Sequence, residues 1–178
     1  MSNYIIIKKK IKNFNKIVSV SGDKSLSIRW VLISSIASGV SNAKNLLISE
    51  DVLAAIQTVK KLGIKVSFNK FSCKIYGKGI NGYEYKNKLT LNAENSGTLG
   101  RLILGLLINS PNSIKLIGDK SLSKRDFKRV TEPLSKFGAK FKFKKKNGLP
   151  LIIQGSKNLV PIKYFEKRGS AQCKSSIM

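Results

Sequence analysis

The sequence predicts an α/β fold made of two copies of a helix–strand–helix–strand–strand unit and the start of a third copy. Asp51 and Asp126 each open a helical pattern that ends twelve positions later at a glycine, Gly63 or Gly138, and an alternating strand pattern follows each glycine. A second set of helical patterns begins at three serines that lie 71 and 74 positions apart: Ser25, Ser96 and Ser170. The matched spacings predict a repeat of about 70 residues.

The first unit shows the punctuation on which these boundaries depend. Its expected elements are a helix at 25–38, a strand at 43–48, a helix at 51–62, and strands at 64–68 and 72–76. Asp51 is suited to the N-cap or first turn of its helix, and Gly63 to the left-handed position that ends it. Gly39 is expected to end the preceding helix.

The second unit repeats this order. Its expected elements are a helix at 96–108, a strand at 113–117, a helix at 126–137, and strands at 139–143 and 149–153. The third unit begins at Ser170 and holds only its first turns before Met178. We therefore expect residues after about Tyr164 to be poorly packed or frayed.

The helix starts at these three serines carry the residues suited to binding anions. A helix N-terminus offers free N–H donors and a partial positive charge. A glycine near it lets a ligand approach the backbone closely. Gly22 precedes Ser25, Gly97 follows Ser96, and Gly169 precedes Ser170. If the units pack around a local axis, the three starts converge on one polyanionic ligand. The alternative is that these serines only cap helices.

Arginine is informative in this chain because lysine is so common. The chain has 34 Lys+Arg against 9 Asp+Glu, a formal net charge of +25, but only five arginines. A lysine-rich chain keeps arginine where a planar fork must hold a phosphate or carboxylate. The five are Arg29, Arg101, Arg125, Arg129 and Arg168.

The composition also excludes several classes of function. There is no histidine, so serine–histidine and cysteine–histidine catalysis and histidine-ligated metals are excluded. Two cysteines, Cys73 and Cys173, cannot form a zinc cluster or a disulfide framework and are typical of reduced cytosolic thiols. The apolar run at 5–7 is too short for a signal sequence. The GxxxxGK[ST] nucleotide-binding loop is absent.

Four motifs resemble those of the EPSP (5-enolpyruvylshikimate-3-phosphate) synthase family, in that family's order and spacing. They are SGDKSLSIR at 21–29, NSGTLGR at 95–101, GDKSLSKR at 118–125 and GSAQCKSS at 169–176. The resemblance covers nearly the whole chain. It implies a cytoplasmic transferase that moves the enolpyruvyl group of phosphoenolpyruvate to the 5-hydroxyl of shikimate 3-phosphate and releases phosphate, with no cofactor or metal. It also implies a monomer that does not act on a membrane or a specific nucleic acid.

The resemblance also assigns site residues. It implies that Lys24 positions both substrates. The shikimate 3-phosphate site would comprise Lys24, Ser25, Arg29, Ser170, Ala171 and Gln172. The phosphoenolpyruvate site would comprise Lys24, Asn95, Gly97, Thr98, Arg101, Arg125 and Gln172. One departure is that Asp126 and Phe127 follow Arg125 where the family usually has Pro and Met, and this acid could help cap the helix or weaken anion binding beside it. Another departure is in the second motif, which has Ser96 and Leu99-Gly100 where the family usually has Ala-Met or similar variants.

The family's fold has two lobes, each of three such units arranged as an inside-out α/β barrel, with the active site between them. The family's chain is well over twice this length, and this chain ends inside an apolar helical run, so we expect an N-terminal fragment. Residues 1–20 would pair with the second lobe, and 21–178 would form an incomplete lobe of units at about 21–90, 91–160 and 161–178. The acid–base carboxylates and a further lysine would come from the second lobe, so the fragment alone would be inactive.

Two other functions remain open at this point. The enolpyruvyl transferase that acts on UDP-N-acetylglucosamine shares the fold, but it typically has Lys-Asn in its first motif and a cysteine before the third arginine. Here Lys24-Ser25 stands in the first motif, and 121–124 holds no cysteine. A basic nucleic-acid-binding module is the other candidate, although no aromatic residues are interleaved with the basic ones.

Overall fold

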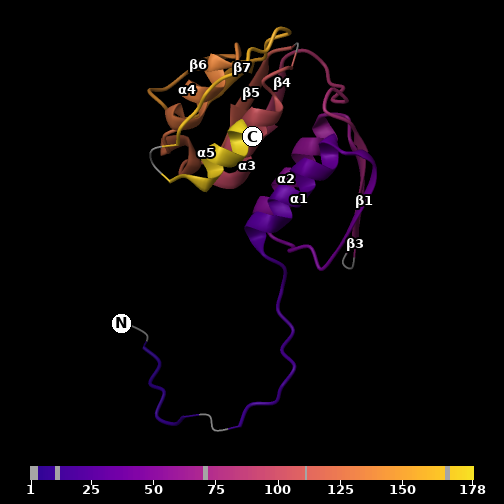
Figure 1. The fold of residues 1–178 in the computed structure, drawn as a ribbon, viewed down its shortest axis with the longest axis vertical. Helices are drawn as coiled ribbons and strands as arrows, with labels where there is room; N and C mark the ends of the chain where they lie inside the picture. The colour runs from indigo at the N-terminus through magenta and orange to yellow at the C-terminus, as the bar shows by residue number, and fades with distance from the viewer. Residues whose placement is uncertain (1–3, 11–12, 70–71, 111, 167–168) are drawn as a thin grey trace.

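The computed structural model describes residues 4–10, 13–69, 72–110, 112–166 and 169–178. Figure 1 shows its helices beside two sheets, with an extended N-terminal arm. In chain order the elements are α1 (Lys24–Ile36), β1 (Ser38–Lys44), α2 (Glu50–Lys61), β2 (Lys65–Phe68), β3 (Ser72–Lys78), β4 (Leu89–Asn92), α3 (Gly97–Leu106), β5 (Ile114–Ile117), the 3₁₀ helix η1 (Leu122–Lys124), α4 (Lys128–Lys136), β6 (Lys140–Phe143), β7 (Leu151–Gln154) and α5 (Ala171–Ile177). None of the helices in these ranges is long and apolar enough to cross a bilayer.

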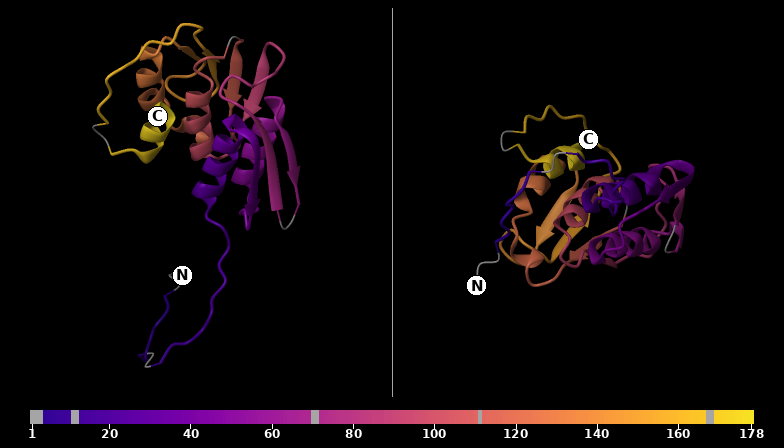
Figure 2. Two further views of the ribbon diagram at one scale, coloured as in Figure 1. Left: turned by 45° about the vertical axis from the view of Figure 1, so that its right-hand side comes forward. Right: turned by 90° about the horizontal axis from the view of Figure 1, so that it is seen from below.

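The strand order of the two sheets confirms the predicted repeat. One sheet has the order β1-β3-β2, and the other has β4-β5-β7-β6. The strand after the unit's first helix pairs antiparallel with the unit's last strand, which pairs antiparallel with the strand between them. We call α1–β3 the first unit and α3–β7 the second unit. Figure 2 shows the two sheets in separate parts of the molecule.

Several predicted boundaries were wrong. Strand β1 spans Ser38–Lys44 rather than 43–48, because the chain turns at Ala37 directly after α1 and pairs with β3 from Ser38 onward. Gly39, with φ +97°, therefore lies inside the strand and does not end the helix. Strand β4 was not predicted, and its pairing with β5 is the parallel contact that extends the second sheet.

The predicted glycine stops are confirmed in both units, whereas Asp126 lies before the N-cap Phe127 and outside the first turn of α4. Asp51 lies in the first turn of α2, and Gly63 and Gly138 follow α2 and α4 with φ of +85° and +108°. Left-handed φ values are accessible to glycine without steric cost, which explains why both helices stop there. The α2 and α4 helices are thus terminated by the same local signal.

The core lies between the helices and the sheets in each unit. Ile28 and Val31 of α1 and Ile75 of β3 are fully buried in the first unit, and Phe127 and Ile153 are fully buried in the second. One connected set of buried apolar side chains joins the two units. The units therefore pack as one body, which places α1 and α3 side by side.

The C-terminal residues contradict the prediction that the chain frays after about Tyr164. Residues 171–177 form α5, which packs on α3, and Cys173 and Ser176 are 1% and 5% exposed. The Ser176 hydroxyl donates to the carbonyl of Arg101. The helix also contacts α4, and Ser175 accepts a hydrogen bond from Arg29 of α1, so three helices hold it on the body.

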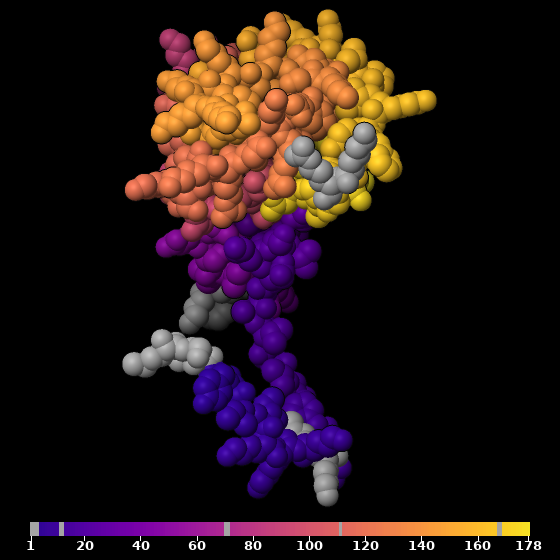
Figure 3. Space-filling model, turned by 90° about the vertical axis from the view of Figure 1, so that its left-hand side faces the viewer, coloured from indigo at the N-terminus to yellow at the C-terminus, as the bar shows by residue number. Residues whose placement is uncertain are grey.

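The N-terminal arm has a different character. Residues 4–10 and 13–20 are exposed and extend away from the body in Figures 1 and 3. The Asn45 side-chain amide donates to the carbonyl of Val20 where the arm joins the body. Pairing of this arm with a second lobe stays a prediction, as do the unit boundaries at 21–90, 91–160 and 161–178.

Candidate anion-binding site

The N-termini of α1, α3 and α5 lie at one end of the molecule, as the sequence predicts. Gln172 in the first turn of α5 donates to the hydroxyl of Thr98 in the first turn of α3, at 3.2 Å. Arg29 of α1 donates to the hydroxyl of Ser175 of α5, at 3.3 Å, and both lie one turn or more beyond their helix starts. The helices therefore run in the same direction, and their free N–H groups open on one side.

Helix capping explains where two of these helices begin. Ser96 accepts a hydrogen bond from Leu99 N, and Ser170 accepts one from Cys173 N. The expectation that Ser25 opens the first helix is corrected, because Asp23 caps it by accepting from Leu26 N at 2.7 Å. The Ser25 hydroxyl instead accepts from Arg29 Nη1 at 2.8 Å. Ser25 and Arg29 thus form a pair on one face of α1.

The first unit contributes a lysine that is already paired. Lys24 Nζ lies 2.8 Å from Asp51 Oδ2, and the Asp51 side chain is only 10% exposed whereas that of Lys24 is 56% exposed. The buried carboxylate in the first turn of α2 therefore anchors the lysine, whose other N–H groups face solvent. A ligand anion would share Lys24 with Asp51.

The second unit contributes arginines that crowd a glycine. A Cβ atom at Gly97 would lie 2.9 Å from Arg125 Nη1 and 3.0 Å from Arg101 Nη1. The two guanidinium groups therefore meet at the first turn of α3, and any side chain at residue 97 would push them aside. Among the described residues, neither arginine has a carboxylate within ion-pair distance. This is a concentration of uncompensated positive charge.

Arg101 is the buried member of this pair. The residue is 4% exposed, and its guanidinium lies over the ring of Phe127, 5.4 Å from the centroid. Burial, followed by the positive charges of Arg129 and Arg125, lowers the pKa of Arg101 from its ordinary value. The site therefore holds a cation in a place where positive charge is unfavourable, and an anion would relieve that repulsion.

The remaining predicted site residues lie around these groups. Asn95 is an exposed turn residue just before the N-cap of α3, and Ala171 is the exposed first residue of α5. Thr98 and Gln172 are half-buried and hydrogen-bonded to each other. The structure thus gathers the predicted residues of α1, α3, the 118–125 loop and α5 at one end of the body.

Sequence reasoning missed two features of the site. Arg129 was noted as a retained arginine without a role, yet its charge acts on Arg101 and its Nε is buried with no hydrogen-bond partner in the described structure. Ser176 holds the backbone of Arg101. The scarcity of arginine in a lysine-rich chain was the available signal for Arg129. Arg168, the fifth arginine, lies outside the described residues.

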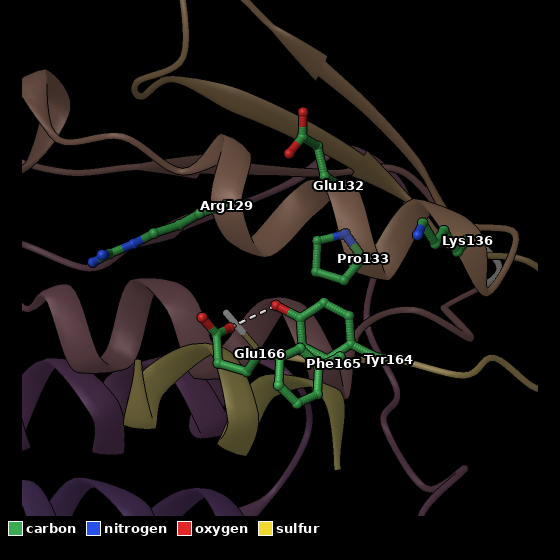
Figure 4. A pocket seen from close by; sticks show the side chains of 7 residues that line it. All are labelled: Arg129, Glu132, Pro133, Lys136, Tyr164, Phe165 and Glu166. Carbon is green, nitrogen blue, oxygen red and sulfur yellow. Dashed lines mark hydrogen bonds between the residues drawn. The ribbon is translucent and has the colours of Figure 1, made fainter. Parts of the chain in front are cut away.

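A separate cavity of about 470 Å³ lies beside α4 and holds none of the predicted site residues. Its lining residues are Arg129, Glu132, Pro133, Lys136, Tyr164, Phe165 and Glu166. In Figure 4 the Arg129 side chain extends away from Tyr164 and Phe165. This cavity therefore adjoins the arginines through Arg129, but neither Arg101 nor Arg125 lines it.

The described residues also contain no group of three or more His, Cys, Asp or Glu side chains placed to hold a metal ion. The acids near the site have other partners. Asp119 accepts from Leu122 N at 2.6 Å and Asp126 from Lys128 N at 2.7 Å, which are capping roles. Glu94 accepts from the Asn92 side-chain amide at 2.6 Å.

Repeated α/β units whose helix N-termini gather at one end define one class of protein, a lobe of the enolpyruvyl transferase fold. The family model for EPSP synthase (3-phosphoshikimate 1-carboxyvinyltransferase) matches residues 8–178, so the chain belongs to this family.

Similar proteins agree with this assignment. The 3-phosphoshikimate 1-carboxyvinyltransferase of Streptococcus pyogenes serotype M2 is 42% identical over 162 residues, which are 90% of this chain and 37% of that protein. An EPSP synthase structure from Acinetobacter baumannii has a TM-score of 0.84 and 34% identity, covering 90% of this chain and 36% of that one. A second structure of that enzyme has a TM-score of 0.83. The chain thus spans about 37% of the length of the curated relatives it matches.

Proposed function

We propose that this protein takes part in the transfer of the enolpyruvyl group from phosphoenolpyruvate to the 5-hydroxyl of shikimate 3-phosphate, with release of phosphate. The reaction belongs to the shikimate pathway, which leads to chorismate and the aromatic amino acids. Residues 21–178 would supply the anion-binding half of the site. The proposal includes action in the cytoplasm as a monomer, with no specific nucleic-acid partner.

The observation that carries the proposal is the meeting of Arg101 and Arg125 at Gly97 without a carboxylate partner in the described structure. Phosphoenolpyruvate bears a phosphate and a carboxylate, which match the planar donors of the exposed Arg125, while the buried Arg101 adds positive charge beside it. The N-terminus of α3 adds backbone N–H donors beside these groups. A compact dianion is therefore the ligand that best fits the second unit.

The first unit fits the other substrate in our proposal. Ser25 and Arg29 share a hydrogen bond on α1, and Ser170 begins α5 beside it. Hydroxyl groups and one arginine suit a phosphorylated cyclic polyol, which needs several hydrogen bonds as well as charge neutralisation. Lys24 would lie between the two ligands, because Asp51 holds it at the start of α1.

Chemistry needs groups beyond these. The reaction protonates the methylene carbon of phosphoenolpyruvate and removes the proton of the attacking hydroxyl, so it requires positioned acids and bases. In the described structure Asp23, Asp119 and Asp126 accept hydrogen bonds from the first turns of helices, and Asp51 pairs with Lys24. We therefore propose that the 178-residue chain binds both anions but does not turn them over alone.

The test is a pair of measurements on the purified chain. Calorimetric titration should show saturable binding of shikimate 3-phosphate and phosphoenolpyruvate, and a phosphate-release assay with both present should show no turnover. Phosphate release at a rate typical of enzymes would disprove the inactivity. Absence of binding to either substrate would disprove the proposed site.

Two further titrations address the other candidate functions. Preference for UDP-N-acetylglucosamine over shikimate 3-phosphate would favour the related transferase. Binding of DNA with a steep salt dependence, and no binding of either small substrate, would favour a nucleic-acid module.

A further inference from the structure

The further inference concerns the role of Arg101, which the family resemblance places among the ligands of phosphoenolpyruvate. Only 4% of the residue is exposed, whereas Arg125 is exposed beside it. The described structure offers Arg101 no carboxylate within ion-pair distance, and its Nε is buried without a hydrogen-bond partner. A buried, unpaired cation is costly, so its retention calls for a specific role.

The hydrogen bonds of Arg101 show where its donors go. Nη1 donates to Gln172 Oε1 at 2.6 Å, and Nη2 donates to the carbonyl of Asp126 at 3.5 Å. Its own carbonyl accepts from the Ser176 hydroxyl. Arg101 is thus hydrogen-bonded to both α5 and the start of α4, and its side-chain donors are directed at protein groups.

This arrangement orients the amide of Gln172. A guanidinium can only donate, so the Gln172 oxygen must face Arg101 and the amide nitrogen must face away from it. That nitrogen uses one N–H for Thr98 Oγ1 at 3.2 Å. Its second N–H is then available to a ligand that binds at the N-terminal ends of α3 and α5. Arg101 therefore converts an ambivalent amide into a hydrogen-bond donor for an anion.

We propose that Arg101 is a positioning residue that acts on the bound anion through Gln172 rather than by touching it. This inference rests on the proposed function, because it assumes that phosphoenolpyruvate binds at the start of α3. It assigns direct contact to Arg125 and to the amide nitrogen of Gln172. Lysine could not replace Arg101, because one ammonium cannot reach Gln172 and the Asp126 carbonyl in the same fixed plane.

The first experiment needs no ligand. Nuclear magnetic resonance would follow the side-chain amide of Gln172 in the chain, in Arg101→Lys, and in Lys174→Gln, a charge-removing control at an exposed position of α5. We expect Arg101→Lys to shift or broaden the two amide signals, while Lys174→Gln leaves them in place. Unchanged Gln172 signals in folded Arg101→Lys would overturn the inference, and thermal unfolding reports whether the variant is folded.

The second experiment measures coupling between the two residues. Phosphoenolpyruvate would be titrated into the chain, Arg101→Lys, Gln172→Met and the double variant. Each single change is expected to weaken phosphoenolpyruvate binding about tenfold. The affinity of the double variant should lie within about twofold of that of the single variant that binds more weakly. Separate losses that multiply to about a hundredfold would show that Arg101 acts independently of Gln172 and would overturn the inference.

The two experiments separate failure of this inference from failure of the proposed function. If the unaltered chain does not bind phosphoenolpyruvate, the proposed function fails, while the amide signals still decide whether Arg101 orients Gln172. If binding is normal but the effects of the two substitutions multiply, the proposed function stands and only the positioning role is lost.

Discussion

The two units of this molecule share a topology but differ in how their basic residues are paired. In both, the strand after the first helix pairs antiparallel with the last strand, which pairs with the strand between them. In the first unit Lys24 is paired with a nearly buried aspartate, and Arg29 bonds to hydroxyls. In the second unit Arg101 and Arg125 meet at Gly97 without such a partner in the described structure.

This difference shows that the backbone repeat supplies helix N-termini, while the side chains decide how strongly each start attracts an anion. A paired lysine has part of its charge already neutralised. Two crowded arginines repel each other, and a bound anion lowers the free energy of that repulsion. The units also differ at their outer edge. Strand β4 extends the second sheet, and the corresponding residues before α1 belong to the exposed arm.

The largest expected effect tests the packing beneath the two sites. Phe127 and Val52 occupy matching positions one residue after Asp126 and Asp51, and both are fully buried. Phe127→Ala should lower the free energy of unfolding by about 3–5 kcal/mol, and Val52→Ala by about 2 kcal/mol. Urea unfolding measures both losses. We expect the second unit to depend more on its one aromatic ring than the first unit depends on Val52, and equal losses would contradict this.

The second prediction compares the arginines of the two sites. Arg125→Lys keeps the charge but loses the bidentate fork, so phosphoenolpyruvate binding should weaken by about 1.5–3 kcal/mol. Arg29→Lys is the matched change in the first unit and should weaken shikimate 3-phosphate binding instead. Titrations of both variants with both ligands are the measurement. Equal loss of both ligands in Arg125→Lys would remove the distinction between the sites.

Gly97→Ala probes the crowding itself. The added methyl group would meet the exposed end of Arg125 at 2.9 Å and the buried guanidinium of Arg101 at 3.0 Å, so the main response should be a shift of Arg125 while the fold keeps its stability. We expect phosphoenolpyruvate binding to weaken by about 1 kcal/mol and the thermal midpoint to stay within about 2 °C. A variant that binds as tightly as the original chain would show that Arg125 does not contact the anion where it now lies.

The smallest effect concerns alkaline pH in the core of the first unit. Cys73 lies opposite Phe68, and in the second unit Leu151 lies opposite Phe143, so a thiol takes the place of a leucine. Burial raises the pKa of Cys73 from 9.0 to about 11. The unfolded thiol therefore ionises first, and the free energy of unfolding should fall as pH rises from 9 toward 11.

At pH 10 the expected contribution of Cys73 is a loss of about 1 kcal/mol. Urea unfolding at pH 8 and pH 10 would measure it, with Cys73→Val as the control that lacks the thiol. Burial also raises the pKa of Tyr83 to about 12, which acts in the same direction above pH 10 and remains in the control. An identical pH dependence in both proteins would exclude the thiol as a cause.

Local signals determined much of the fold. The Asp51–Gly63 and Asp126–Gly138 spacings predicted α2 and α4, because helix caps and left-handed glycines act within a few residues. The boundaries that failed depend on distant partners. Strand β4 exists through its pairing with β5, β1 takes its start from β3, and α5 is ordered by packing on α3.

The sequence by itself determined the repeat, the glycines that end α2 and α4 and the small set of arginines, because periodicity, capping and composition are properties of neighbouring residues. Only the tertiary structure decided that Asp51 holds Lys24, that Arg101 is buried against Phe127, and that its donors orient Gln172. These contacts join residues from different helices, and their energies depend on burial and on nearby charges. A pattern along the chain contains neither quantity.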